Sequence, residues 1–182
     1  MHAIVWIPHS IDLITMPTRN DRPISIRRFD KSDLNRVLRL VSQIDSPEDL
    51  VMAAQAQFTR EFEEKPCDEA RFVADYAGVV IGTMGCSRGP IPSKLALWAD
   101  WLVVDKRFRR QNVATLLYKN VENFAMTLGK KYLCLDVGNI DAQRAAYAFH
   151  FRNGFQIVGQ IPDYWGELQH LNIMTKYLAK KD

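Results

Sequence analysis

A long apolar strand, a short basic loop and an amphipathic helix follow one another without interruption between residues 95 and 128. Residues 95–104 are rich in Trp, Val and Leu, which is typical of a strand in a sheet. From residue 113 onward, apolar side chains recur every three or four positions, so one face of a helix is apolar until Gly129 ends it. Four of the five residues in 106–110 are Lys or Arg. This succession predicts a mixed α/β fold in which a charged turn connects a strand directly to a helix.

Strand-like and helix-like segments alternate along the rest of the chain. Two strand-like runs meet at Ala77-Gly78, which predicts a tight hairpin. Ser46 followed by Pro47 predicts the start of a helix that Pro66 stops. The predicted strands are 24–29, 71–77, 79–86, 95–104, 132–137, 155–161 and 168–178, and the predicted helices are 31–41, 46–64, 113–128 and 142–153.

Length and composition indicate one globular domain. Of the 182 residues, 47% are apolar, and we expect residues 1–23 to form an arm packed on a single domain at 24–182. No apolar run reaches the roughly 18–20 residues of a membrane span, and the N-terminus lacks a basic signal region, so we expect a cytoplasmic protein without a membrane partner. Three scattered cysteines match neither a disulfide framework nor a metal site.

The basic loop is a candidate phosphate site. Free N–H groups at the start of a helix, together with the positive end of the helix dipole, attract phosphate. Ala114 lets a ligand approach the backbone closely, and a net charge of +3 suits an anionic small ligand if the cations are concentrated here. The alternative is that these four cationic side chains belong to an ordinary surface loop and are simply solvated by water. A third interpretation is that the same cations contact nucleic acid. It is weaker, since so small a net charge does not indicate a nucleic-acid partner.

Residues 109–114 resemble the cofactor motif of the GNAT superfamily of N-acetyltransferases, Arg/Gln-x-x-Gly-x-Gly/Ala. The resemblance extends back to Val103-Val104-Asp105 and forward to Asn153-Gly154-Phe155, and the family's element order covers residues 24–178. It implies an α/β (α+β) fold with a mostly antiparallel central sheet, splayed between its fourth and fifth strands and flanked by about four helices.

The resemblance also implies acetyl-CoA as the acetyl donor and no metal. Backbone groups of residues 111–115 would cradle the pyrophosphate, and those of 102–104 would pair with the pantetheine. Asn112 departs from the family's first glycine, although asparagine tolerates a left-handed backbone better than most residues. The cofactor-binding residues implied are Leu102, Val103, Val104, Arg109, Arg110, Gln111, Asn112, Val113, Ala114, Thr115, Asn139 and Gln143.

Three residues are candidate acids and bases for acetyl transfer. Asp100 occupies the place of the family's carboxylate on the fourth strand, and its alternative is a structural ion pair with an arginine. His150 stands where family members carry the tyrosine that protonates the leaving thiolate, and its alternative is a structural histidine. Tyr147, one helical turn earlier, is the second candidate for that acid.

The acceptor is expected to be a primary amine, on a small molecule or on a protein N-terminus or lysine. The aromatic pair Tyr164 and Trp165, with acids on either side, could hold a cationic amine, or it could simply cap the core. The rival interpretation is a sensor that binds acyl-CoA, or a docking module, without turnover. A homodimer is compatible with either interpretation.

Overall fold

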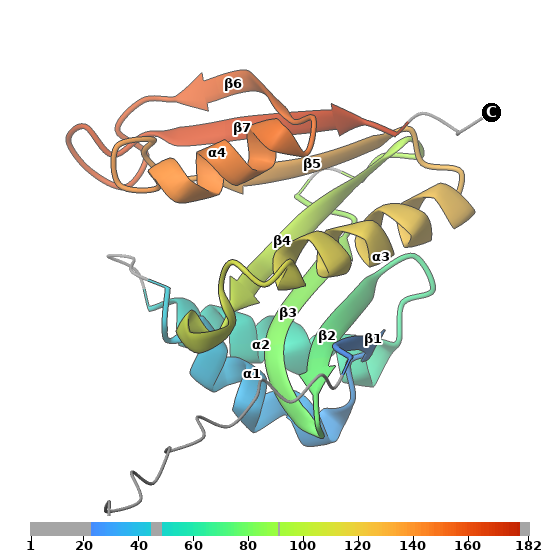
Figure 1. The fold of residues 1–182 in the computed structure, drawn as a ribbon. Helices are drawn as coiled ribbons and strands as arrows, with labels where there is room; N and C mark the ends of the chain where they lie inside the picture. Colours follow the sequence, from blue (N-terminus) through green and yellow to red (C-terminus); the bar gives the residue numbers. More distant parts are fainter. Residues whose placement is uncertain (1–22, 45–48, 91, 179–182) are drawn as a thin grey trace, which may run out of the picture.

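The computed structural model describes residues 23–44, 49–90 and 92–178, which form a mixed sheet with helices on both faces (Figure 1). The sheet has the strand order β1-β2-β3-β4-β5-β7-β6. Its strands are β1 Ser25–Arg28, β2 Ala70–Tyr76, β3 Val79–Ser87, β4 Ala96–Val104, β5 Tyr132–Val137, β6 Gln156–Ile161 and β7 Leu171–Tyr177. The α-helices of the described part are α1 Leu34–Val41, α2 Leu50–Glu64, α3 Val113–Thr127 and α4 Arg144–Arg152, and short 3-10 turns occupy Lys31–Asp33 and Lys106–Phe108.

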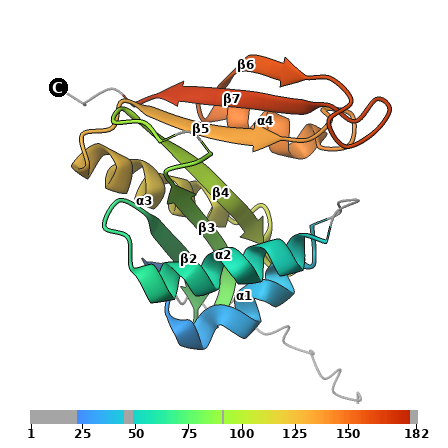
Figure 2. The ribbon, with the colours of Figure 1, turned by 180° about the vertical axis from the view of Figure 1, so that it is seen from behind.

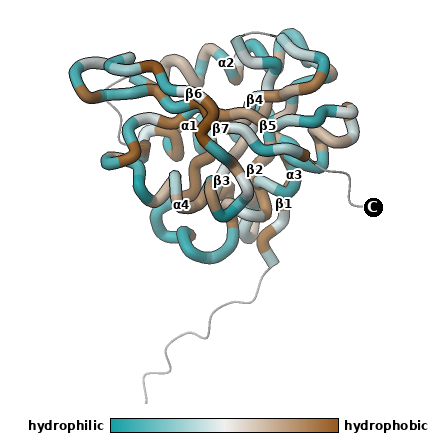
Figure 3. The backbone as a smooth tube through the Cα atoms, turned by 90° about the horizontal axis from the view of Figure 1, so that it is seen from above, coloured by the Kyte–Doolittle hydropathy of each residue, from teal (hydrophilic) through white to brown (hydrophobic). Residues whose placement is uncertain are grey.

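The helices divide the core into two layers. Helices α1 and α2 cover one face of the sheet, where Val37 and Phe58 pack with Val73 of β2 (Figure 2). Helices α3 and α4 cover the other face, where Leu117 and Tyr147 pack with the apolar side of β5. Seen from above, hydrophobic stretches gather where strands and helices overlap, and many of the outer loops are hydrophilic (Figure 3).

The sheet is splayed between β4 and β5, as predicted. These two strands run parallel and pair only over residues 96–98 and 132–134. Every other neighbouring pair of strands is antiparallel. Beyond Trp98, β4 and β5 diverge into a wedge, with β1 to β4 on one side and β5 to β7 on the other (Figure 1). The predicted fold class is therefore confirmed.

A bulge in β4 lies inside the wedge. Thr83 of β3 pairs with Val103 and Gly85 pairs with Asp100, so two residues of β4 oppose one residue of β3. Trp101 lies in the bulge and has a left-handed backbone, with a φ of 50°. Side chains along a strand normally alternate between faces, but this bulge places Asp100 and Trp101 on the same face, toward α2.

Several predicted boundaries need correction. Helix α2 runs from Leu50, and the Asp49 carboxylate caps it by accepting from the Val51 and Met52 amides. The start predicted at residue 46 lies outside the described residues. Strand β7 begins at Leu171 rather than 168, because Leu168 has a φ of 59° and lies in a turn. The hairpin at Ala77-Gly78 is confirmed, with φ values of 55° and 81°.

The sequence also made predictions about the N-terminal arm, membrane spans and the cysteines. The arm predicted at residues 1–23 lies, except for its last residue, outside the described residues. Among the helices that are described, none is long and apolar enough to cross a membrane. The three cysteines are free thiols, with Cys67 exposed and the other two buried.

Candidate active site

The start of α3 presents unpaired backbone amides. The first amide to bond back into the helix is that of Leu116, 3.1 Å from the Asn112 carbonyl. No described backbone carbonyl accepts from the amides of residues 113–115. Arg110 and Asn112 both adopt left-handed backbones, with φ values of 63° and 64°, and this turns the chain sharply into the helix. The site therefore has the donors and the dipole that an anionic group requires.

A buried carboxylate anchors the basic loop to α1. Asp105 is 2% exposed and accepts from Arg107 at 2.9 Å and from Arg36 of α1 at 2.7 Å. The hydrogen bonds from Arg107 hold the pKa of Asp105 well below its usual range, although burial opposes the shift. The loop before α3 is thereby held rigidly against the rest of the domain.

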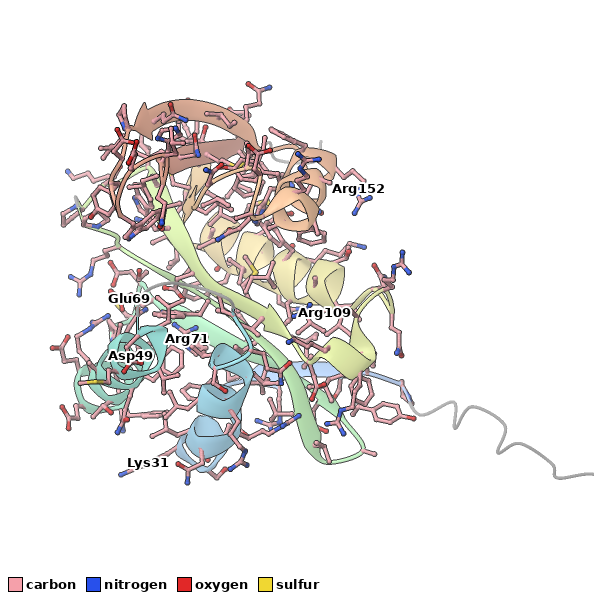
Figure 4. The ribbon with its side chains drawn as sticks, turned by 90° about the vertical axis from the view of Figure 1, so that its left-hand side faces the viewer. Lys31, Asp49, Glu69, Arg71, Arg109 and Arg152 are labelled. Carbon is pink, nitrogen blue, oxygen red and sulfur yellow. The ribbon has the colours of Figure 1, made fainter. Side chains whose placement is uncertain are left out.

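Three cations of this loop remain available. Lys106, Arg109 and Arg110 pair with no carboxylate of the described residues. The Arg109 Nε instead donates to the Val104 carbonyl at 3.2 Å, which brings this side chain to the end of β4 (Figure 4). The free amides, the cations and the open edge of β4 thus lie together. Cofactor binding by residues 102–104 and 109–115 stays a prediction.

Asp100 lies in a polar network under α2. Its carboxylate accepts from Arg71 Nη2 at 2.7 Å and from Gln57 Nε2 at 2.9 Å. Arg71 is 1% exposed at its side chain and also binds Glu61, at 2.8 Å. The Gln57 carbonyl accepts from the Trp101 indole at 2.8 Å, so one α2 side chain holds both residues of the bulge. The ion pair that the sequence left open for Asp100 is present.

Asp136 is an acidic residue in the wedge that the sequence predictions did not include. It follows the segment Leu133-Cys134-Leu135 of β5. Its neighbours Leu135 and Val137 are buried in the core. Asp136 is exposed as a residue, but neighbouring protein atoms remove part of the hydration of its carboxyl group. Burial, and then the charge of Asp100, raise the pKa of Asp136 above the ordinary value. An acid at the outward position of an apolar strand was the available sequence signal.

The two candidate thiolate acids are both hydrogen-bonded within the protein. His150 is 8% exposed, its Nδ1 lies 3.3 Å from the Tyr118 hydroxyl, and burial lowers its pKa to about 4. The imidazole is therefore neutral at pH 7. The Tyr147 hydroxyl donates to the Gly138 carbonyl at 2.8 Å, and burial raises the pKa of Tyr147. Catalytic roles for both residues stay predictions.

The remaining predicted residues lie around the open end of β5. Asn139 donates to the Leu168 carbonyl and so ties the β5–α4 loop to the β6–β7 loop. Gln143 is the residue that precedes α4, and its side chain makes no capping bond. The rings of Tyr164 and Trp165 lie 5.0 Å apart at 88°. The predicted aromatic pair therefore exists as a packed edge-to-face pair on the β6–β7 loop.

A polar pocket opens beside the Asp100 network. Its volume is about 420 Å³. Gln57, which binds Asp100, forms part of its wall, so one side chain is shared between the pocket and the Asp100 network. The other lining residues are polar or small: Arg60, Glu69, Ser87, Arg88, Gly89 and Pro92. A polar molecule of modest size could enter here next to the wedge.

Several solved structures share this fold. A protein described as a GNAT-family acetyltransferase from Desulfovibrio desulfuricans superposes with a TM-score of 0.78 at 17% identity, covering 86% of this chain and 100% of that one. Ard1 from Thermoplasma volcanium has a TM-score of 0.71 at 24% identity, with 86% and 99% covered. The yncA protein of Salmonella typhimurium, solved with its cofactor acetyl-CoA, has a TM-score of 0.68 at 16% identity, with 88% and 96% covered.

Sequence comparison identifies the family. No curated protein matches the chain. Residues 38–155, more than half of the chain, match the model of the Acetyltransferase (GNAT) family. This segment contains α2, the splayed strands β4 and β5, the basic loop, α3 and α4. The chain therefore belongs to the acetyltransferase (GNAT) family of acyltransferase enzymes.

Proposed function

We propose that this chain transfers the acetyl group of acetyl-CoA to a primary amine by direct attack of the amine. The observation that carries the proposal is the set of free amides at residues 113–115, which lie beside unpaired arginines near the end of β4. Acetyl-CoA supplies an acetyl thioester, which reacts readily with a neutral amine. The residues present fit a diphosphate at the start of α3 and an extended chain along β4.

The loop residues bind the donor by charge and by backbone hydrogen bonds. Arg109 and Arg110 offset the charge of the diphosphate, and the amides of residues 111–115 donate to its oxygens. Asn112 supplies the left-handed backbone that aims these amides outward. The free edge of β4 at residues 102–104 offers hydrogen bonds to amide groups in the extended part of the donor.

The acceptor reaches the wedge from the side of α2. The polar pocket beside Gln57 has room for a small polar amine or for the end of a peptide. Asp100 is held by Arg71 and Gln57, which supports a role in holding a cationic acceptor by a fixed charge. Tyr164 and Trp165 offer aromatic faces on the opposite side of the wedge. These features support an amine acceptor and are compatible with a small molecule, a protein N-terminus or a lysine.

A charge-reversing double variant tests the donor site. Arg109→Glu with Ala114→Asp is expected to abolish binding of CoA, measured by isothermal titration calorimetry, because it places two carboxylates where the diphosphate would lie. The fold should persist, since an acid in the first turn of a helix favours the helix. Lys119→Glu with Asn123→Asp makes the same change in net charge at exposed positions farther along α3 and should leave binding intact.

Turnover separates an enzyme from a sensor. With acetyl-CoA and a panel of amines, release of free thiol supports the proposed reaction. Saturable CoA binding without thiol release across the panel would instead support a sensor. CoA binding that the double variant leaves unchanged would show that the donor binds elsewhere.

A further inference from the structure

Strand register places two carboxylates on opposite sides of the wedge at the same level. The last pair between the parallel strands β4 and β5 is Trp98 with Cys134. Asp100 and Asp136 each follow two residues later, and the bulge of β4 begins only after Asp100. The two acids are therefore the first pair beyond the point where the strands separate, and they project toward the same face of the sheet.

That face is the one that α2 covers. Leu133, Leu135 and Val137 of β5 belong to the core beneath α3 and α4, so Asp136 points the other way. Asp100 points toward α2, because Gln57 of α2 binds it. Because of this proximity, the charge of Asp100 adds to burial in raising the pKa of Asp136.

The two acids differ in their partners. Asp100 has both carboxylate oxygens engaged, by Arg71 and by Gln57. Asp136 makes no ion pair with any described residue, and its carboxylate is open to the wedge. Both oxygens of Asp100 are therefore already occupied by donors of the protein, whereas the carboxylate of Asp136 is free to receive a proton from a ligand in the wedge.

We infer that Asp136 is the general base that removes a proton from the acceptor's ammonium group, an inference that rests on the proposed function. The ammonium gives one proton to an Asp136 oxygen. The neutral nitrogen then forms a bond to the acetyl carbon, the carbon–sulfur bond breaks, and the sulfur leaves with the electron pair. The nitrogen loses its second proton, the sulfur gains one, and Asp136 returns its proton to solvent.

The groups around Asp136 favour this role. On β4 it faces Asp100, which pairs with Arg71. Arg71 also pairs with Glu61 of α2, so one cation is shared between two carboxylates. On β7 its partner in the ladder is Ile173, which carries no charge. Partial enclosure and the neighbouring acid both make Asp136 hold a proton more tightly than an ordinary aspartate does. A cationic amine bound in the wedge would offset the excess negative charge of these carboxylates.

The variant Asp136→Asn separates a catalytic role from a structural one. We expect kcat, measured with the fastest acceptor of the amine panel, to fall by about 10²-fold or more, while CoA affinity is unchanged. The deficit should shrink as the pH approaches the pKa of the amine, because free amine then needs no base. The melting temperature at pH 7 should stay the same or rise, because the variant removes an unpaired, partly enclosed charge. Asp141→Asn, at an acid 75% exposed in the next loop, is the matched control and should behave as the unmodified protein.

Direct titration provides a readout that does not depend on activity. Carbon-detected NMR of the ligand-free protein, with the signal assigned by its loss in Asp136→Asn, should show the Asp136 carboxyl titrating above the range of ordinary aspartates. An ordinary titration midpoint, a fully active Asp136→Asn variant, or a variant that simply loses stability would each overturn the inference. The proposed function would survive these results as long as the unmodified protein binds CoA and releases thiol. Failure of the unmodified protein to do so would overturn both.

Discussion

At the scale of the residue, burial decides the charge state of His150. The sequence places this histidine where the family carries an acid, and the structure surrounds it with Tyr118, Phe149 and Phe155. Among the residues that the structure describes, its imidazole has one polar contact, with the Tyr118 hydroxyl. A charged imidazolium in such a site would lose its hydration without gaining a carboxylate, so the neutral form is favoured.

The burial of His150 predicts a loss of stability on acidification. Its pKa is about 4 in the folded protein and roughly 6.5 in an unfolded chain, so between these values only the unfolded chain takes up the proton. The contribution of His150 to stability is fully present above the pKa of the unfolded chain, and it is lost as the pH falls from there toward the folded pKa. We expect it to lower the free energy of unfolding by roughly 2 kcal/mol at pH 5 relative to pH 8. Urea unfolding at a series of pH values measures this change.

The variant His150→Phe isolates the contribution of the histidine. Its stability should depend less on pH between 4 and 6.5, whatever its stability at pH 8. An acid dependence identical to that of the unmodified protein would show that folding does not lower the pKa of His150.

At the scale of the element, β2, β3, β4 and α2 meet at one ion-pair network. Arg71 of β2 reaches across β3 to bind Asp100 of β4, and Glu61 of α2 closes over it. The crossing point is Gly85, where a β-carbon would lie 2.6 Å from the Asp100 carboxylate and 2.7 Å from the Arg71 guanidinium. The arginine thus occupies the space of the missing side chain, and its ring contact with Phe58, at 4.0 Å, completes the packing.

A methyl group at Gly85 should therefore disturb both the network and the bulge of β4. We expect Gly85→Ala to lower the free energy of unfolding by roughly 1–3 kcal/mol, the usual range for overpacking, and also to lower kcat. Denaturant unfolding and steady-state kinetics measure the two effects. Gly159→Ala in β6 is the control, because its β-carbon would meet nothing closer than 4.0 Å. Equal stability of the two variants would mean that Arg71 can move aside freely.

At the scale of the whole molecule, a wedge separates two halves of one sheet. The halves share a ladder of three residue pairs between β4 and β5. They also share an aromatic cluster in which Tyr118 of α3 packs against Phe149 of α4 and against Phe155. These contacts join the two halves, and beyond Trp98 the edge of β4 that faces β5 has no partner strand among the described residues.

Hydrogen exchange should detect the free edge of β4. In the ligand-free protein, amides of residues 99–104 that face β5 should exchange much faster than those of the β5–β7 ladder, because they have no partner strand. Saturating CoA should slow the exchange of the β4 amides and of residues 113–115, and should leave the β6–β7 ladder unchanged. Exchange followed by NMR resolves these positions. Uniform protection across the domain, without local change at β4, would contradict pairing at this edge.

Much of the architecture follows from local patterns in the sequence. Periods of two and of three to four residues predict the strands and helices, and the basic turn before the α3 helix identifies the candidate phosphate site. These signals depend on neighbours in the chain, so they can be read without knowing the fold. The start of β7 was misplaced because Leu168 adopts a left-handed turn, which the local sequence pattern does not reveal.

The chemistry of the acids was decided by tertiary structure. Asp100 meets Arg71 only because β3 carries a glycine between them, and Asp136 meets Asp100 only because β4 and β5 pair in one register and then separate. Whether a carboxylate is paired, enclosed or free depends on groups brought from distant parts of the chain, and those groups set its proton affinity. The sequence by itself therefore determined the fold and the candidate donor site, whereas the folded sheet determined which of its acids is paired and which is not.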